Sequence, residues 1–240
     1  MKSLKGKVVL ITGASEGLGK QLAFDLAKLH VKLAIIARTE TKLTVVKKRV
    51  EKLGSRCEYY VCDVSDENQV DKTAQNILRD FRTVDILINN AGIYDEDDRL
   101  RKNKKKIKEM FGTNVLGVLF FTNAFLPFMK KRNSGQIFNV ISIAGVEPSD
   151  VWGMYVATKY AVRGFTESVR LSVSGTNIKV MGFYPHGMNT NIFKAAGLDF
   201  AQNEPWMMKV EDISNIILFI LQQPDDVSMD HVEVRKIELN

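Results

Sequence analysis

A tyrosine and a lysine four positions apart, Tyr155 and Lys159, are the residues in this sequence best suited to acid–base chemistry. On a helix, this spacing places both side chains on one face. A phenol titrates near pH ~10, and a fixed ammonium beside it favours the phenolate. Lowering that pKa by about three units takes roughly 4 kcal/mol, which one charge about 4 Å away supplies at an effective dielectric of ~20. The pair predicts proton transfer near neutral pH in a partly closed cleft, although the same spacing also occurs on solvated helix faces.

Several glycines stand between an expected strand and an expected helix near the start of the chain. Residues 8–11 are apolar, which predicts a strand buried on both faces, and residues 21–30 have apolar positions at helical spacing. Glycines between such elements let the backbone approach a pyrophosphate, and the helix N-terminus attracts its charge. We therefore expect a phosphate-binding loop rather than a merely structural turn. Its candidate residues are Gly13, Ser15, Gly17, Leu18 and Gly19.

Arg38 follows the second expected strand, over residues 32–37. At this point a dinucleotide-binding fold contacts the adenosine ribose. An acidic side chain there would bind the 2′-hydroxyl of NAD, whereas a guanidinium can pair bidentately with a 2′-phosphate. With Ala37 before it and no acid in its place, Arg38 predicts NADP(H) as the cofactor; an ordinary loop arginine is the alternative.

Two further strands are expected to end beside a nucleotide. Asp63 follows the expected strand over residues 56–61, and it could accept a hydrogen bond from an adenine amino group or simply be a turn residue. The expected strand over residues 85–88 runs into small residues, which let backbone pass close to a flat ligand. The candidate residues at these two places are Asp63 and Val64, and Asn90, Ala91 and Gly92.

Strands and helices alternate along the whole chain. Further helices are predicted over residues 40–53, 66–81, 110–129, 153–173 and 210–223, and further strands over residues 136–141, 178–184 and 232–239. This alternation predicts an α/β fold with a doubly wound parallel sheet of the Rossmann type, as a single domain over residues 1–240. Ligands of such sheets bind beyond the carboxyl ends of the strands, and the candidate residues are expected there.

Two segments bear on the surface of the molecule. The helix over residues 110–129 is apolar almost all round, so it must be covered on more than its sheet side. We therefore expect a homodimer or homotetramer, with this helix and the Tyr155 helix at the interface. The charges from Arg99 to Lys106 are expected to form a solvated surface.

Composition sets broad limits on the class of protein. The chain has 240 residues, 45% of them hydrophobic, which is enough for one sizeable core. A net charge of +6 permits an anionic ligand but does not by itself indicate nucleic acid. Cys57 and Cys62 form no disulfide framework and are expected to be reduced thiols. We find no metal-ligand motif and no segment as long as a membrane span, and expect a cytoplasmic protein that binds no membrane.

Together these motifs resemble the short-chain dehydrogenase/reductase family over nearly the whole chain. The matching residues are Gly13, Gly17 and Gly19 after Thr12, Asp63, Asn90, Ala91 and Gly92 after Asn89, Asn114, Ser142, Tyr155, Lys159, Pro185 and Thr190. The resemblance implies hydride transfer between NADP(H) and a carbonyl or alcohol of a small molecule. It implies cofactor binding by Gly13, Ser15, Gly17, Leu18, Gly19, Arg38, Asp63, Val64, Asn90, Ala91, Gly92, Tyr155, Lys159, Pro185 and Thr190.

The same resemblance implies a catalytic role for each of four residues. Ser142 would hold the substrate oxygen by a hydrogen bond, and Tyr155 would give a proton to the developing alkoxide or take it in oxidation. Lys159 would lower the pKa of Tyr155 and bind the nicotinamide ribose, and Asn114 would fix a water in a proton relay to Lys159. Thr190 would form a hydrogen bond with the carboxamide of the nicotinamide. A positioned acid beside the oxygen lowers the barrier to hydride transfer.

Two residues depart from the family's usual pattern. Glu16 stands where many NADP-dependent members have a base, so the prediction of a 2′-phosphate contact rests on Arg38 alone. His186 stands where the family usually has a glycine after Pro185. We expect His186 to point to solvent; the alternative is that it shapes the pocket.

One other function remains open. A dinucleotide-binding regulator without turnover could lose Ser142 or Tyr155, and this chain has both. A sugar epimerase of the extended branch would need an added substrate domain, for which this chain is too short. The substrate would be shaped by residues 143–153 and 188–206, whose apolar side chains suggest an apolar compound. These side chains are Val151, Trp152, Ile192, Phe193, Phe200 and Trp206.

Overall fold

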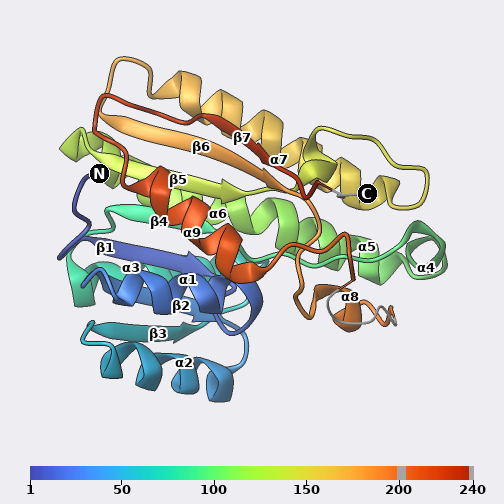
Figure 1. Cartoon of the computed structure of the whole chain (residues 1–240), viewed down its shortest axis with the longest axis horizontal. Coiled ribbons are helices and arrows are strands. Elements are labelled where there is room, and N and C mark those ends of the chain that lie inside the picture. Colours follow the sequence, from blue (N-terminus) through green and yellow to red (C-terminus); the bar gives the residue numbers. More distant parts are fainter. Residues whose placement is uncertain (199–203, 238–240) are drawn as a thin grey trace.

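A single parallel sheet runs through the protein. The structure, a computed structural model, describes residues 1–198 and 204–237, apart from the side chains of residues 98–100. Its strands lie in the order β3-β2-β1-β4-β5-β6-β7, and every neighbouring pair is parallel (Figure 1). They are β1 Val8–Thr12, β2 Lys32–Ala37, β3 Cys57–Val61, β4 Ile86–Asn89, β5 Gly135–Val140, β6 Ile178–Pro185 and β7 His231–Val234. The order reverses between β1 and β4, where such sheets bind ligands.

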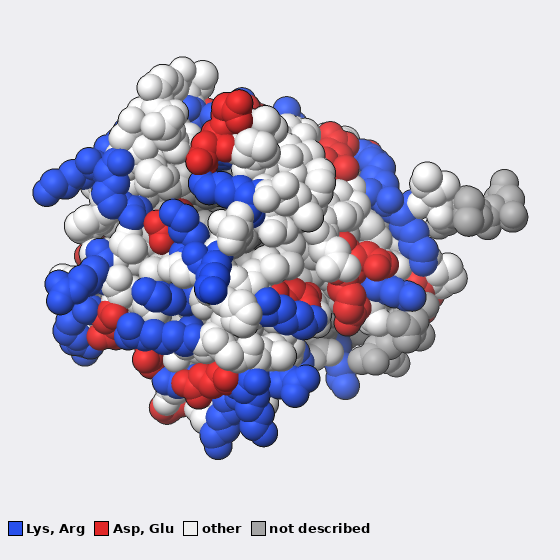
Figure 2. All heavy atoms as spheres, turned by 60° about the vertical axis from the view of Figure 1, so that its left-hand side comes forward, with Lys and Arg blue, Asp and Glu red and all other residues white. Residues whose placement is uncertain are grey.

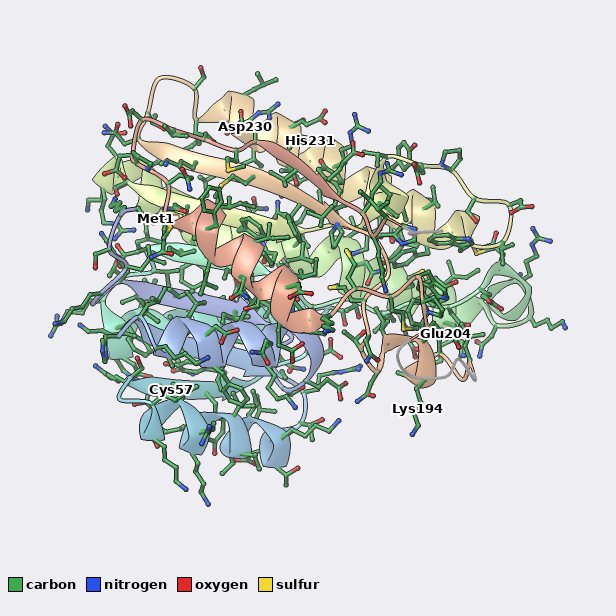
Figure 3. All side chains as sticks on the ribbon, in the orientation of Figure 1. Met1, Cys57, Lys194, Glu204, Asp230 and His231 are labelled. Carbon is green, nitrogen blue, oxygen red and sulfur yellow. The ribbon has the colours of Figure 1, made fainter. Side chains whose placement is uncertain are left out.

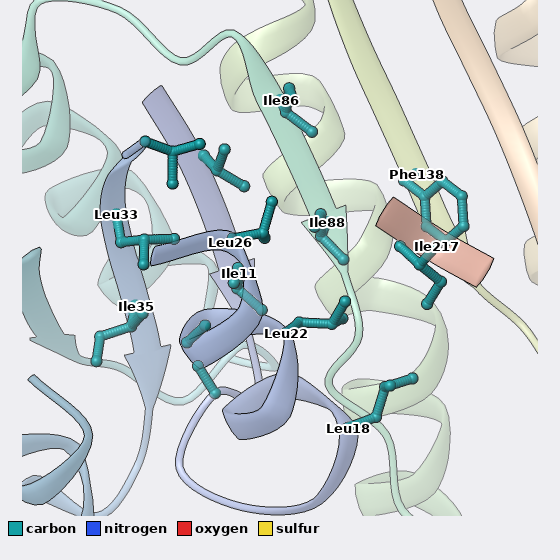
Figure 4. Close-up of a cluster of buried hydrophobic side chains, with 14 of the residues drawn as sticks. Ile11, Leu18, Leu22, Leu26, Leu33, Ile35, Ile86, Ile88, Phe138 and Ile217 are labelled. Atoms are coloured by element: carbon teal, nitrogen blue, oxygen red, sulfur yellow. The ribbon is translucent and has the colours of Figure 1, made fainter. Parts of the chain in front are cut away.

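Helices cover both faces of the sheet, because alternate strand residues point to opposite faces and are apolar on both. Val9 and Ile11 of β1 pack with α1, α2 and α9, whereas Val8 and Leu10 pack with α3, α6 and α7. These helices are α1 Gly17–Ala27, α2 Glu40–Lys52, α3 Glu67–Phe81, α6 Gly117–Arg132, α7 Gly153–Ser172 and α9 Val210–Leu221. Figure 4 shows Leu22 of α1 beside Ile11, with Ile217 of α9 beyond it.

The predicted fold class is confirmed, and the differences lie at the ends of elements. Two short helices, α4 Asp97–Lys102 and α8 Ile192–Ala195, were not predicted, because such short segments carry too few periodic positions. The edge strand predicted over residues 232–239 is the shorter β7, and Leu239 lies outside the described residues.

The long apolar helix is longer than predicted. It runs over Lys104–Arg132 as α5 Lys104–Phe111, a π-helical turn at Gly112–Leu116 and α6. Among the described residues it is the one helix long and apolar enough to cross a membrane, a test of length and composition that the core helix of a soluble protein also passes. Part of this helix needs no partner subunit to cover it, because Phe121 is fully buried against the sheet.

The run from Arg99 to Lys106 is only partly the solvated surface that we expected. Arg101 and the lysines up to Lys105 are exposed, but Lys106 donates a 2.7 Å hydrogen bond to buried Asp95. The side chain of Arg99 lies outside the described residues.

Other basic residues gather where helices end. The last turns of α2, α3 and α6 contain Lys52, Arg79 and Arg132, where cations compensate the helix dipole. Figure 2 shows the end of the molecule where the strands begin, with Lys and Arg spread over it among Asp and Glu. This end is opposite the carboxyl ends of the strands, so its charge has a structural explanation independent of the candidate site.

Candidate active site

The glycine loop joins β1 to α1 at the carboxyl end of the sheet. Gly13 and Gly17 have φ values of +68° and +52°, which favour glycine, and a Cβ on Gly13 would lie 2.8 Å from the Cα of Ala91. Glu16 precedes the first turn of α1 but makes no side-chain cap, so the backbone N–H groups of that turn remain available to an anion. The loop therefore fits the pyrophosphate of a dinucleotide.

The adenosine side of the site has one exposed cation and one carboxylate that already accepts hydrogen bonds within the protein. Arg38 follows β2 and is exposed. The Oδ1 atom of Asp63 accepts hydrogen bonds from the backbone N (3.0 Å) and Oγ (2.7 Å) of Ser65. Asp63 therefore stabilises a turn, as the alternative interpretation of this residue predicts. The Val64 side chain packs beneath Gly117, where a Cβ would lie 2.8 Å from it. Among the described residues, no cluster of His, Cys, Asp and Glu could hold a metal ion.

The segment after β4 is fixed to β1 by a threonine. The Oγ1 atom of Thr12 accepts from the backbone N atoms of Asn90 (3.0 Å) and Ala91 (3.1 Å). Asn90 in turn donates through Nδ2 to the carbonyl oxygen of Thr12 at 3.0 Å, so its side chain holds the backbone of the two segments together. Thr12 belongs to the matching glycine motif but was not among the predicted catalytic or cofactor-binding residues; a hydroxyl at the last position of the strand was the available signal.

Asn114 lies in the π-helical turn and braces the same segment. Its Oδ1 accepts from the backbone N of Ile93 at 2.8 Å, and its Nδ2 donates to the carbonyl oxygen of Ile93 at 2.9 Å and to Oγ1 of Thr158 at 3.2 Å. Thr158 also donates to the carbonyl oxygen of Tyr155 at 2.7 Å. Single π-helical turns are frequent at functional sites because the extra residue redirects a side chain. Thr158 was missed, although it stands between the two residues of the predicted pair.

Ser142, Tyr155 and Lys159 come together as predicted. Ser142 lies close enough to Tyr155 to lower the pKa of its hydroxyl, and the Nζ of Lys159 lies 5.4 Å from the centroid of the Tyr155 ring. A Cβ placed on Gly92 would lie 3.7 Å from that Nζ and 3.5 Å from Oδ1 of Asn114. Gly92 therefore allows Lys159 and Asn114 to approach the same point.

The charge states differ from the sequence-based expectation. Burial raises the pKa of Tyr155 to about 12, against a lowering by the hydrogen bond with Ser142. Burial also lowers the pKa of Lys159 to about 8. The expectation that Lys159 brings the pKa of Tyr155 down towards neutrality is wrong for the chain by itself. Removal of the phenol from water is the largest cause of its shift, and Lys159, whose Nζ lies 5.4 Å from the ring centroid, does not offset it.

Ser142 is held in an unusual backbone conformation. Its φ of 146° and ψ of 158° fall in a region that is essentially restricted to glycine, at a cost of about 1–3 kcal/mol. Neighbouring hydrogen bonds maintain it, from Gly145 N to the Ser142 carbonyl oxygen at 2.8 Å and from Ala144 N to its Oγ at 3.2 Å. Such strain persists at sites where it aims a side chain, and in this protein it belongs to the residue that lowers the pKa of Tyr155.

Aromatic rings cover Tyr155, which is only 7% exposed. The Tyr94 ring packs edge-on against three others, with centroid distances of 5.0 Å to Tyr155, 6.1 Å to Trp152 and 5.3 Å to Phe193. Phe193 then packs against Trp206 at 5.5 Å. The aromatic residues proposed for substrate binding therefore gather at Tyr155, except Phe200, which lies outside the described residues. Tyr94 was missed, because it follows a strand without any motif of its own.

The loop after β6 brings Trp206 to this cover. Trp206 lies so close to Gly187 that a Cβ there would be 2.1 Å from its ring, and the His186 ring packs edge-on against it at 6.4 Å. The expectation that His186 simply points to solvent is therefore wrong. Figure 3 shows Lys194 of α8 pointing away from the sheet beside this loop.

The same loop reaches the glycine loop, where the methyl group of Thr190 lies 3.4 Å from a Cβ placed on Gly17. Pro185 ends β6 and is buried.

Comparison with known proteins agrees with this geometry. The chain matches the family model for short chain dehydrogenases over residues 7–199. It is 35% identical to the NADP-dependent 3-hydroxy acid dehydrogenase of Schizosaccharomyces pombe, covering 95% of this chain and 91% of that protein. It is 30% identical to the farnesol dehydrogenase of Aedes aegypti, covering 97% and 96%. Its structure is similar to that of an alcohol dehydrogenase from the archaeon Thermococcus sibiricus complexed with 5-hydroxy-NADP, with a TM-score of 0.89, 26% identity and coverage of 98% and 99%.

Proposed function

Because this chain belongs to the short-chain dehydrogenase/reductase family, we propose that it transfers hydride between NADP(H) and a carbonyl or alcohol carbon of a small apolar substrate. Tyr155 is the proton donor in reduction and the acceptor in oxidation. The observation that carries this proposal is the position of the Lys159 ammonium, 5.4 Å from the centroid of the buried Tyr155 ring, with Ser142 close enough to lower the pKa of the Tyr155 hydroxyl. Residues 1–240 act as one catalytic domain in this proposal.

The charge states suit a reductase. A neutral Tyr155 hydroxyl holds its proton at pH 7 and can donate it to an alkoxide as charge develops on the substrate oxygen. Ser142 holds that oxygen by a second hydrogen bond, and Lys159, with a pKa of about 8, is mainly cationic at pH 7 and stabilises negative charge nearby. Asn114 and Thr158 keep the helix that carries Tyr155 in register with the segment after β4.

The residues present fit NADP(H), whose nicotinamide supplies or accepts the hydride when bound. The uncapped N-terminus of α1 offers backbone N–H groups to the pyrophosphate, and Arg38 offers a cation to the 2′-phosphate. Pro185 at the end of β6 and Thr190 in the loop after it, beside Gly17 of the glycine loop, complete the proposed cofactor site. The NADP-dependent relative from Schizosaccharomyces pombe and the NADP-type ligand of the archaeal enzyme support the same assignment.

The aromatic cover supports an apolar substrate. Tyr94 and Trp152 pack against Tyr155, and Phe193 packs against Tyr94, so a substrate that reaches the Tyr155 hydroxyl must displace or contact rings. Ring faces and edges favour apolar or flat groups over charged ones. The farnesol dehydrogenase of Aedes aegypti acts on an apolar alcohol by its name, which supports the same substrate class.

The test is a turnover screen with NADPH and with NADH against a panel of aldehydes and ketones. We expect oxidation of NADPH with at least one apolar carbonyl, and tighter binding of NADPH than of NADH. Replacing Ala37→Asp together with Arg38→Leu should shift the preference towards NADH, since it exchanges the cation for an acceptor of the ribose hydroxyl. Tight NADPH binding without turnover of any carbonyl or alcohol would instead favour a dinucleotide-binding regulator.

A further inference from the structure

Glu16 places an acid inside the glycine loop, where a phosphate-binding protein would rather have a base. Lys42 compensates this charge, because its Nζ donates a 2.9 Å hydrogen bond to Oε2 of Glu16. Lys42 lies in the first turns of α2, four residues after Arg38. A cation from another element therefore stands beside position 16 of the loop.

The pair is held in place from more than one side. Hydrogen bonding to Lys42 is the largest cause that lowers the pKa of Glu16, so the carboxylate is ionised at neutral pH. Asn191, which immediately precedes α8, and Lys20 also lower the pKa of Glu16. Glu16 thus lies between the start of α8 and α2, and its hydrogen bond holds the Lys42 ammonium beside the loop.

The exposure of the pair argues against a purely structural role. The side chains of Lys42 and Glu16 are 52% and 45% exposed. Ion pairs this open to water contribute little to the stability of a fold. An ammonium has three donors, and Glu16 uses one, so others remain for a further acceptor.

We propose that Lys42, positioned by Glu16, is a second cation for the 2′-phosphate of NADP(H) beside Arg38. The inference rests on the proposed function only for its cofactor. The guanidinium of Arg38 pairs with two phosphate oxygens, and the ammonium of Lys42 donates to another while it keeps its bond to Glu16. The base missing from position 16 of the loop is in this way supplied by α2. NADH, which has a hydroxyl in place of the phosphate, gains nothing from Lys42.

The experiment is calorimetric binding of 2′,5′-ADP and of 5′-AMP to the full-length protein, in the wild type and in Lys42→Met. These two probes differ in the 2′-phosphate and need no turnover. We expect Lys42→Met to weaken 2′,5′-ADP binding about tenfold or more, to leave 5′-AMP binding unchanged and to reduce the salt dependence of 2′,5′-ADP binding. The matched control is Lys48→Met, which removes an exposed lysine from the same helix and should change neither affinity.

A double variant separates loss of the cation from damage to the loop. Lys42→Met combined with Glu16→Lys moves the positive charge into the loop itself and should restore most of the 2′,5′-ADP affinity. Unchanged 2′,5′-ADP binding in Lys42→Met, equal losses for both probes, or a double variant that stays as weak as Lys42→Met would overturn the proposal. A wild type that binds 2′,5′-ADP more tightly than 5′-AMP but turns over no carbonyl would refute the proposed catalysis and leave this inference intact.

Discussion

Tyr155 and Lys159 are buried together, and burial shifts the pKa of each in the direction that its charge dictates. Burial disfavours the charged form, so the pKa of the phenol rises to about 12 and that of the ammonium falls to about 8. Lys159 forms no ion pair with any of the described residues. A buried cation without a carboxylate destabilises a fold, which indicates that Lys159 is retained for function.

The role of Tyr155 as acid is tested by Tyr155→Phe. The variant keeps the ring that packs against Tyr94 and removes only the transferable proton. We expect turnover to fall by a factor of at least ~100, because general acid catalysis contributes that much or more. Steady-state kinetics with saturating NADPH measures this, and fluorescence titration should show nearly unchanged NADPH affinity. Near-native turnover in the variant would refute the assignment.

The burial of Lys159 predicts a gain in stability from Lys159→Met. Lowering its pKa from 10.5 to about 8 corresponds to about 3 kcal/mol of destabilisation of the cofactor-free protein below pH 8. As the pH rises from about 8 to 10.5, the folded state releases the proton first, so the wild type regains this free energy. Urea unfolding should show the variant to be more stable at pH 7, with a smaller difference near pH ~10. A difference that does not vary with pH would contradict burial of the ammonium as its cause.

At the scale of elements, three separate segments of the chain each contribute one aromatic ring to the cover over Tyr155. Tyr94 comes from the loop after β4, Trp152 from the start of α7, and Phe193 from α8. Trp206 reaches the cover because Gly187 has no Cβ to exclude it. Bridging backbone hydrogen bonds, including Met208 N to the Gly187 carbonyl oxygen at 2.9 Å, hold the segments on either side of α8 together.

Tyr94 is expected to limit the size of the substrate, since its ring contacts those of Tyr155, Trp152 and Phe193. Tyr94→Ala should raise kcat/KM for bulky bicyclic ketones relative to small ones by about tenfold, because removing a ring leaves space and reduces apolar contact with small substrates. The control is Tyr94→Phe, which keeps the ring contacts and should keep the native ranking. A ranking unchanged in the alanine variant would show that Tyr94 does not line the path of the substrate.

At the scale of the whole molecule, the long helix divides its apolar side chains between the core and the surface. Phe121, Phe125 and Met129 lie under the sheet, whereas Leu116 and Phe128 are 42% and 47% exposed. The neighbouring helix α7 exposes Leu171 as well. These exposed side chains, rather than Phe121, are the reason to expect self-association.

The prediction of a homodimer or homotetramer is tested by light scattering at micromolar concentration. We expect the wild type to have at least twice the monomer mass, and Leu116→Glu to reduce that mass because it places a charge in an apolar contact. Val45→Glu is the control, since Val45 is also exposed but lies on α2, away from this face. A wild type of monomer mass would refute the prediction.

The sequence by itself determined the order of the elements and the place of the site. Buried strands such as residues 8–11 are apolar on both faces, and the right-handed helical crossovers between parallel strands leave few topologies. All loops that follow strands must then meet at one end of the sheet, so Ser142, Tyr155 and Lys159 could be assigned to one site before their contacts were known. These features depend on periodicity along the chain, which is visible in the residues.

Only the tertiary structure decided the charges and contacts within that site. The pKa of Tyr155 depends on how much water is excluded by Tyr94, which lies 61 positions away in the chain. The salt bridge between Glu16 and Lys42 joins two elements whose distance no spacing rule fixes. Desolvation and ion pairing act through space between residues remote in sequence, so their sign and strength follow from the packed fold and not from the pattern of residues.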